Sequence, residues 1–277
     1  MKNISKNLIL LLMCILYSAT VLADEKLHTR NGTTIVKDTA DMEVVYVHIA
    51  VDPVKDKRKV IYEMLSIGDN FFKYGGYDDY QVDSIYMSDP EFNPPFEESM
   101  SFLRKFDRIY NTTLTDRNNG SITFYGKVSM DYFHYSEPLP EINWILTDES
   151  DEVMGYQCKK ATARWRGRNW TAWYSDIPID AGPWKFQGLP GLILKLEDES
   201  GEHYFETVGM KDDIYPFGYK KRLYSKSTRE KFNAAVKNYS ENCGNILVDS
   251  GMIIPQSEEE ESTLRSRRLF YAPIELE

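Results

Sequence analysis

Three carboxylates have neighbours that could support catalysis. Asp176, Asp180 and Glu197 lie close in sequence to Trp173 and Trp184. A pair of carboxylates flanking a bound sugar is the arrangement that glycoside hydrolysis requires. Acids at the ends of strands also form turns and pair with arginines, so the structural interpretation of these three stays open beside the catalytic one.

Cys158 is the other candidate for chemistry. It lies among basic residues that include Lys160 and Arg164, and nearby positive charge lowers the pKa of a thiol and makes it nucleophilic. Two structural roles are equally open. Cys158 could face the core of a sheet as a free thiol, with Cys243 exposed at a helix end, or the two cysteines could form a disulfide in an oxidising compartment.

Motifs for other chemistries are missing from the sequence. None of the four histidines has a second histidine three or four positions away, and there is no HExxH pattern, nucleophile elbow, P-loop or dinucleotide glycine pattern. We therefore expect no metal and no cofactor.

The stretch Gly155–Asp198 must position these side chains. Residues 156–165 and 169–174 alternate in character and are separated by a short turn that contains Gly167, which predicts a β-hairpin. Leu192, Leu194 and Leu196 are expected to share one face of a third strand.

The segment that leads into the third strand is rich in proline and glycine. Pro190 and Gly191 suit the two central positions of a type II turn, which predicts a positive φ at Gly191. We expect thirteen residues to hold the stretch in shape: Gly155, Cys158, Gly167, Trp173, Pro178, Gly182, Pro183, Gly188, Leu189, Pro190, Gly191, Leu192 and Ile193.

The same blocks carry a family resemblance. Gly188–Ile193 spells GLPGLI, and GYQCKKA, RGRNWTAWYSDIPI and GPWKFQGLPGLIL occur around it in order, with YAPIELE at the C-terminus. In these blocks the chain resembles the GLPGLI family of exported bacterial proteins. The resemblance covers about residues 140–210, and Ala272 stands where Asn is commoner. It implies export and a shared fold, but the family has no established activity or catalytic residues to carry over.

The rest of the chain predicts a mainly β protein with a few helices. We expect strands at 42–51, 59–67, 71–74, 80–86, 122–135 and 203–208, and helices that begin near residues 96 and 227. Residues 24–40 and 209–226 are expected to be irregular. Hairpins in series with amphipathic helices favour a curved antiparallel sheet or half-barrel, similar by analogy to bacterial lipoprotein-carrier proteins.

Residues 1–23 are typical of a signal peptide, with Lys2 and Lys6 before an apolar run and Ala23 at the cleavage position. Cys14 lies inside that run without a lipobox, so lipidation is not expected. We expect one domain over 24–277, periplasmic or secreted. The net charge of −10 argues against a nucleic-acid partner.

Two functions remain open from the sequence. The favoured one is a non-enzymatic envelope protein that binds a lipid, another apolar or envelope ligand, or an outer-membrane protein. The alternative is a hydrolase acting on glycans or peptides, with Asp176, Asp180 or Glu197 as its acids. The sequence does not decide the oligomeric state.

Overall fold

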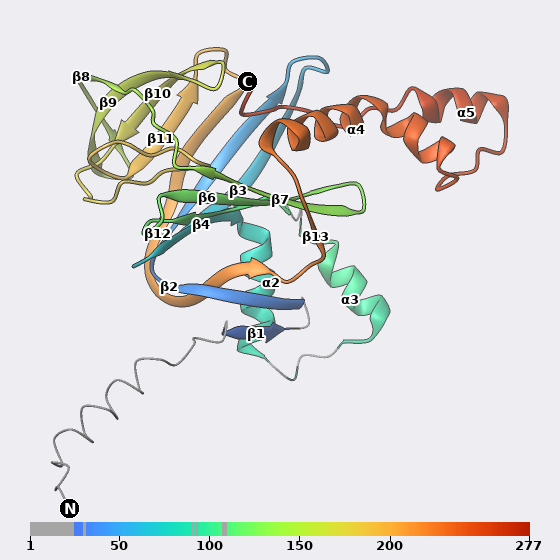
Figure 1. The fold of residues 1–277 in the computed structure, drawn as a ribbon, viewed down its shortest axis with the longest axis horizontal. Coiled ribbons are helices and arrows are strands. Elements are labelled where there is room, and N and C mark those ends of the chain that lie inside the picture. Colours follow the sequence, from blue (N-terminus) through green and yellow to red (C-terminus); the bar gives the residue numbers. More distant parts are fainter. Residues whose placement is uncertain (1–24, 30–31, 90, 92–93, 107–109) are drawn as a thin grey trace, which may run out of the picture.

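The computed structural model describes residues 25–29, 32–89, 91, 94–106 and 110–277 (Figure 1). The predicted leader, residues 1–23, lies outside the described residues. The strands are β1 (Lys26–Thr29), β2 (Gly32–Asp52), β3 (Lys57–Gly68), β4 (Phe71–Gly76), β5 (Thr112–Asp116), β6 (Ser121–Val128), β7 (Asp131–Pro138), β8 (Ile145–Val153), β9 (Tyr156–Trp165), β10 (Arg168–Tyr174), β11 (Ile193–Asp198), β12 (His203–Lys220) and β13 (Tyr224–Lys226). The helices are α2 (Tyr77–Ser88), α3 (Phe96–Leu103), α4 (Arg229–Asp249) and α5 (Glu258–Arg265).

All strands belong to one 13-stranded sheet with the order β13-β7-β6-β5-β4-β3-β2-β12-β11-β10-β9-β8, and β1 pairs beside β2. Every pairing is antiparallel except that of β13 with β7. The sheet is curved and open, and its end strands β13 and β8 do not meet in the described part of the chain. The prediction of a mainly β fold built on a curved antiparallel sheet is confirmed.

Two long strands, β2 and β12, run together through the middle of the sheet. Their pairing extends from Ala50 opposite His203 to Thr34 opposite Lys220, and it shifts register at three places. Such bulges bend a strand and increase its twist, and both strands curve visibly in Figure 1. The expectation that residues 24–40 and 209–226 are irregular is therefore wrong for 32–40 and 209–220, because these two polar segments pair with each other.

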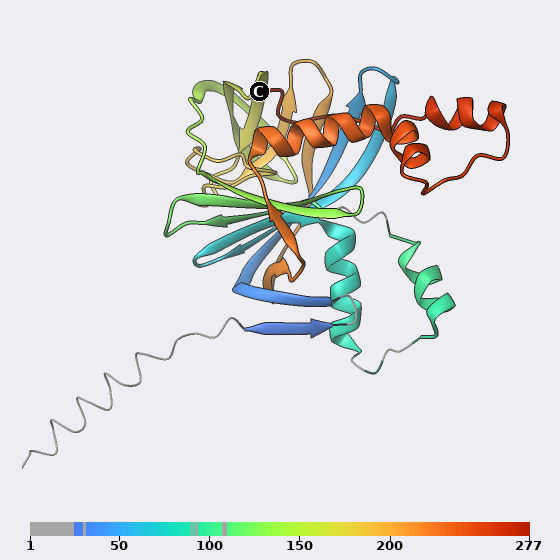
Figure 2. The same cartoon turned by 45° about the vertical axis from the view of Figure 1, so that its right-hand side comes forward.

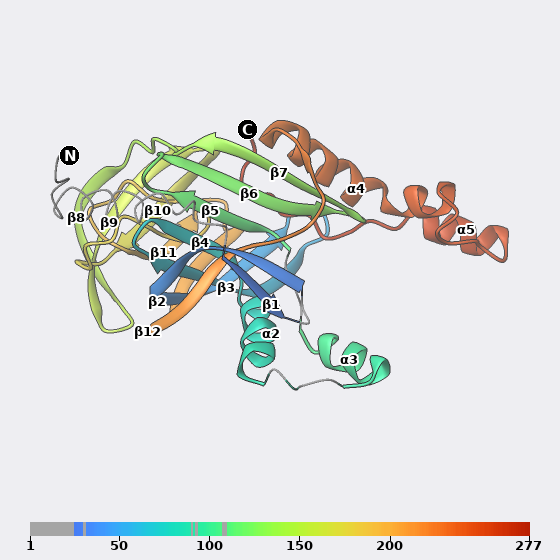
Figure 3. The same ribbon diagram turned by 60° about the horizontal axis from the view of Figure 1, so that its bottom comes forward.

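The helices cover the sheet unevenly. α4 lies across β6 and β7 (Figure 2). There Phe232 packs on Phe124 and Tyr135. α2 packs beside β3 and β4, and α3 and α5 extend away from the sheet (Figure 3). None of the helices that the structure describes has the length and apolar character needed to cross a membrane.

The predicted hairpin of the signature stretch is confirmed. Trp165 pairs with Arg168, so Arg166 and Gly167 form a two-residue turn with φ values of 49° and 78°. Two positive φ values are characteristic of the type I′ turn, whose twist matches the flanking strands.

The hexapeptide turn differs from the prediction. Gly188 has the positive φ, at 92°, whereas Gly191 does not occupy the left-handed region. Gly191 is needed for another reason, because a Cβ there would lie 1.9 Å from the carbonyl oxygen of Ser175. The expected type II turn at Pro190 and Gly191 is corrected to a close crossing of two backbone segments.

The third strand also differs in its alternation. The register shifts where Trp173 pairs with Lys195 and Tyr174 pairs with Ile193, so Leu194 is an extra residue in β11. As a result Ile193 and Leu196 belong to one core cluster, and Leu192 and Leu194 belong to another. The three leucines do not share a face as the unbroken alternation predicted.

Cys158 and Cys243, the two cysteines within the described residues, are free and buried. The Cys158 thiol donates to the carbonyl of Tyr156, and the Cys243 thiol donates to that of Arg267. Of the open alternatives, the structure therefore has free thiols, with the correction that Cys243 is enclosed where α4 meets the segment after α5.

Candidate ligand-binding site

A cavity of about 250 Å³ lies between the sheet, α4 and the C-terminal segment. Its sheet wall is formed by residues of β2, β3, β6 and β7, and its other walls by α4 and Phe270–Glu275. Most of the lining is aliphatic or aromatic, including Phe124, Trp184, Phe232 and Phe270. A concave, mostly apolar space with a few polar groups is the usual form of a small-molecule site.

A chain of buried polar side chains crosses the sheet beside this cavity. His203 of β12 lies 3.1 Å from His48 of β2, and His48 lies 2.9 Å from the Glu63 carboxylate of β3. Tyr74 of β4 donates to the same carboxylate oxygen at 2.9 Å. These residues are diagonal neighbours on one face of adjacent antiparallel strands, which places their side chains within reach of one another.

The chain of contacts continues on the other side of His203. Asp198 accepts from the His203 backbone N–H and from Arg168, whose guanidinium lies 2.6 Å away. Arg168 is 5% exposed and also donates to Glu202 and to the carbonyls of Pro273 and Ile274. A buried guanidinium with this many acceptors is a fixed structural element, because its charge is fully paired and hydrogen-bonded.

A second charged cluster surrounds Lys185, which is 3% exposed. Its ammonium lies 2.6 Å from Glu137 and 2.8 Å from Glu275, and it donates to the Tyr135 hydroxyl at 3.1 Å. Glu275 also accepts the indole N–H of Trp184 at 2.9 Å. Arg166 and Arg229 complete the cluster within 3.6 Å of the same two carboxylates.

The C-terminal segment is held in place by both clusters. Arg168 binds the carbonyls of Pro273 and Ile274, and the Leu276 N–H donates to the Arg166 carbonyl at 3.0 Å. The Tyr271 N–H donates to Asp52 at 2.9 Å. The YAPIELE ending is therefore a strap that closes one side of the cavity.

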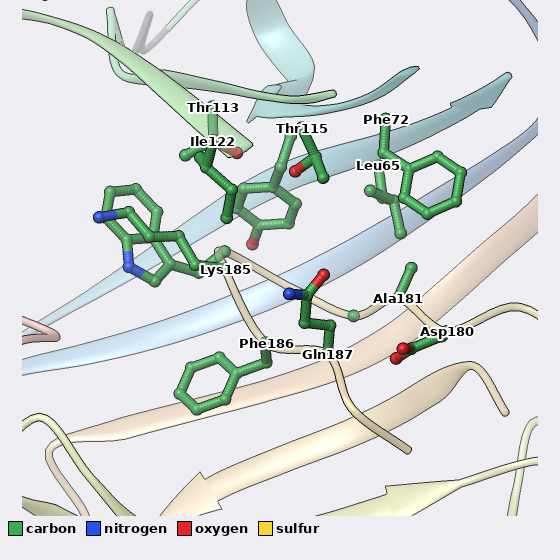
Figure 4. Close-up of a pocket in the computed structure, with 13 residues that line it drawn as sticks. Leu65, Phe72, Thr113, Thr115, Ile122, Asp180, Ala181, Lys185, Phe186 and Gln187 are labelled. Atoms are coloured by element: carbon green, nitrogen blue, oxygen red, sulfur yellow. The ribbon is translucent and has the colours of Figure 1, made fainter. Parts of the chain in front are cut away.

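The signature stretch supplies the floor of this arrangement. Trp184 has a φ of 57°, which is unusual for a bulky residue and is maintained only where the surroundings fix it. Figure 4 shows the segment from Asp180 to Gln187 crossing over the strands that carry Leu65 and Phe72. The space enclosed there is about 10 Å³, enough for about one water, so the larger cavity is the only one of the two that admits a ligand.

Burial keeps one histidine and two tyrosines beside the cavity uncharged. Burial lowers the pKa of His203 to about 3, with the neighbouring His48 and Arg168 acting in the same direction. Burial raises the pKa of Tyr74, and the adjacent Glu63 raises it further. Burial likewise raises the pKa of Tyr135. His203 is therefore neutral and both tyrosines remain hydrogen-bond donors at neutral pH.

The three acids predicted from the sequence do not come together in the cavity. Asp176 and Asp180 are exposed, and Asp180 accepts the backbone N–H of Gly188 as a turn-forming residue. Glu197 lies on the sheet face opposite that of its neighbour Asp198, and none of the three lines the cavity. Burial raises the pKa of Cys158 to about 11, so its basic neighbours in the sequence do not activate it.

Sequence reasoning missed the residues that do surround the cavity. His48 carried no usable signal, because both faces of the strand predicted at 42–51 are largely apolar and the alternation does not indicate which face is buried. Its partners Glu63 and His203 are 15 and 155 positions away, and no local pattern indicates the register that joins them. Within the described residues, no group of three or more His, Cys, Asp or Glu side chains is arranged to hold a metal ion.

Comparisons with known proteins found matches to the signature stretch and to the fold. A family model described as a protein of unknown function (Porph_ging) matches residues 166–195, which contain the hexapeptide. No curated protein matches the chain.

Two solved structures of PNGF-II are similar to the chain. The one in space group C2 has a TM-score of 0.50 at 14% identity, and the one in P21 has 0.49 at 13%. Each match covers 74% of this chain and 34% of the PNGF-II chain. The chain therefore spans about a third of the length of these relatives, and the likeness to the C2 structure concerns the fold alone.

Proposed function

We propose that this protein is an exported, non-enzymatic member of the GLPGLI family that binds a small apolar ligand of the cell envelope in the cavity under the C-terminal strap. One observation carries the proposal: a cavity of about 250 Å³ with aromatic walls lies where the strap, α4 and the sheet meet. Burying an apolar ligand there gains roughly 25 cal/mol per Å² of apolar surface removed from water.

Glu275, one of the two carboxylates that line the cavity, is placed for a structural role and not for hydrolysis. A hydrolase needs a carboxylate that is free to attack or to exchange a proton with the substrate. Glu275 instead has both oxygens engaged, by Trp184 and Lys185 on one side and by two arginines on the other. Removing such a carboxylate from its partners would leave buried charges uncompensated, so it has a structural role.

The experiment that tests this function is mass spectrometry of the protein purified from its native envelope. Native spectra of the wild type should contain a mass excess that denaturation releases as a small apolar molecule. Val236→Trp would fill the cavity from α4 and should abolish the excess.

The matched control is Val208→Trp. Val208 is 48% exposed on β12 and does not line the cavity, so this variant should retain the ligand. The same molecule bound to Val236→Trp, or no molecule bound to any of the three proteins, would count against the proposal.

A further inference from the structure

We infer that the ligand of the cavity is an uncharged molecule that donates one hydroxyl or amide hydrogen bond to Glu63 Oε1. This inference rests on the proposed function and names the chemical group of the ligand that the cavity recognises. It follows from counting the protons along the hydrogen-bonded chain of His203, His48 and Glu63.

The contact between His203 and the strap fixes the first proton position. His203 Nε2 lies 3.1 Å from the carbonyl oxygen of Pro273, and a carbonyl can only accept, so Nε2 carries a hydrogen. His203 is fully enclosed and neutral, so its Nδ1 is an acceptor. The neighbouring nitrogen, His48 Nε2 at 3.1 Å, must therefore be the donor.

One proton is then left between His48 Nδ1 and Glu63 Oε2, which are 2.9 Å apart. Without it, two lone pairs would face each other in a buried site. Whichever of the two atoms carries the proton, the His48–Glu63 pair has no net charge. Tyr74 donates to the same Oε2, so that oxygen has two partners.

The second oxygen, Oε1, has no hydrogen-bond partner within the described part of the chain. Oε1 is not one of the unpaired atoms that are fully shielded from solvent, so it is accessible. Glu63 is 6% exposed and lines the cavity. Whether Glu63 is a carboxylate or a carboxylic acid, Oε1 is an acceptor. A ligand without a donor would leave it unpaired, which is costly in an apolar cavity.

The proton positions on His203, His48 and Glu63 also predict the charge of the ligand. The three cations of the Lys185 cluster, Lys185, Arg166 and Arg229, are matched by three carboxylates, because Arg229 also pairs with Glu230 at 2.8 Å. With the His48–Glu63 pair also neutral, a charged ligand would have no counter-charge in the cavity. Burying an unpaired charge is strongly unfavourable. A neutral donor, such as a hydroxyl or an amide N–H on an apolar body, satisfies both conditions.

Isothermal titration calorimetry with two probes of the same body tests the inference. The probes are 2-naphthol, which has a hydroxyl donor, and 2-methoxynaphthalene, in which a methyl group replaces the donated hydrogen. We expect 2-naphthol to bind the full chain at least about tenfold more tightly, the usual value of a hydrogen bond to a charged or desolvated acceptor. Glu63→Gln keeps an acceptor oxygen and should keep the preference, whereas Glu63→Leu should remove it.

The outcomes separate this inference from the proposed function. Equal affinity of the two probes for the wild type, with Val236→Trp blocking both, would overturn the donor inference and leave cavity binding intact. Failure of both probes to bind the wild type would overturn the donor inference together with the cavity-binding function. If Glu63→Leu does not fold, the wild-type ratio and the Glu63→Gln ratio still decide.

Discussion

Gly191→Ala is expected to destabilise the fold by steric overlap. The added Cβ would lie 1.9 Å from the Ser175 carbonyl oxygen and 3.2 Å from that of Ile177. Both are backbone atoms of a segment that is tied to the hexapeptide by hydrogen bonds between Ser175 and Leu192 (2.9 Å) and between Leu192 and Ile177 (3.0 Å). The methyl group can be accommodated only if these bonds lengthen or break.

The magnitude follows from those contacts. Overpacking of this kind costs about 1–3 kcal/mol, and each weakened hydrogen bond adds about 1 kcal/mol. We therefore expect a loss of roughly 2–5 kcal/mol in the free energy of unfolding, which lowers the melting temperature by roughly 5–15 °C for a chain of this size. Urea unfolding followed by circular dichroism measures the free energy, and a thermal scan measures the temperature.

Gly209→Ala is the matched control. Gly209 lies in β12 and does not have a positive φ. The atom nearest to a Cβ added there would be the Val45 Cβ, at 4.0 Å, so alanine should be neutral or slightly stabilising. Gly191→Asn separates the steric cause from a left-handed backbone, because asparagine tolerates positive φ better than alanine does. If Gly191→Ala unfolds like the wild type, or if asparagine clearly restores stability, the close-approach explanation is wrong.

Three further outcomes follow from the structure. His203 has a pKa held near 3 against an ordinary value of 6.5. Below pH 6.5 the unfolded chain therefore binds a proton that the folded chain refuses, so stability should be complete above pH 6.5 and fall toward pH 3 by up to about 1.4 kcal/mol per pH unit. His203→Gln should flatten that slope in urea titrations, and an equally steep slope in the variant would contradict the assignment. Removing the strap, Tyr271–Glu277, should abolish binding of 2-naphthol and lower the melting temperature, because buried cations lose their partners; unchanged calorimetry would show that the strap is dispensable. Cys158 and Cys243 should both titrate as thiols after unfolding without reductant, while Cys158 should resist alkylation in the native protein at pH 8 because its pKa is raised to about 11; a single disulfide in the unfolded chain would refute this.

The sequence predicts the parts of the fold that depend on short patterns. The strand predicted at 42–51 lies within β2, and the Gly167 turn predicts the β9–β10 hairpin. Residues 80–86 show the weakness of the same method. Their alternating Tyr and Val predicted a strand, but they form the middle of α2, in which Val82, Asp83 and Tyr86 are buried at helical spacing.

Sequence reasoning could not predict the cavity for a physical reason. Every contact that defines it joins segments far apart in the chain, as when Trp184 donates to Glu275 across 91 positions. Bulges in β2, β11 and β12 decide which side chains meet, and a bulge leaves no simple compositional signal. The family resemblance identified the stretch that forms the floor of the cavity, but not the side chains that close it.

The proposed export and family membership remain predictions that the structure leaves open. N-terminal sequencing of the mature protein should find Asp24 as its first residue, because cleavage is expected after Ala23. A protein that retains Met1, or one acylated at Cys14, would contradict the predicted leader.

The most direct test of the central claim compares the ligand before and after it occupies the cavity. The molecule released from wild-type protein by denaturation is added back to ligand-free protein, incubated, released again and weighed by mass spectrometry. Binding without chemistry predicts saturable uptake by the wild type and Val208→Trp, none by Val236→Trp, and an unchanged mass on release. Fragments whose summed mass exceeds that of the ligand by one water, formed by the wild type but not by Val236→Trp, would contradict the account and identify a hydrolase.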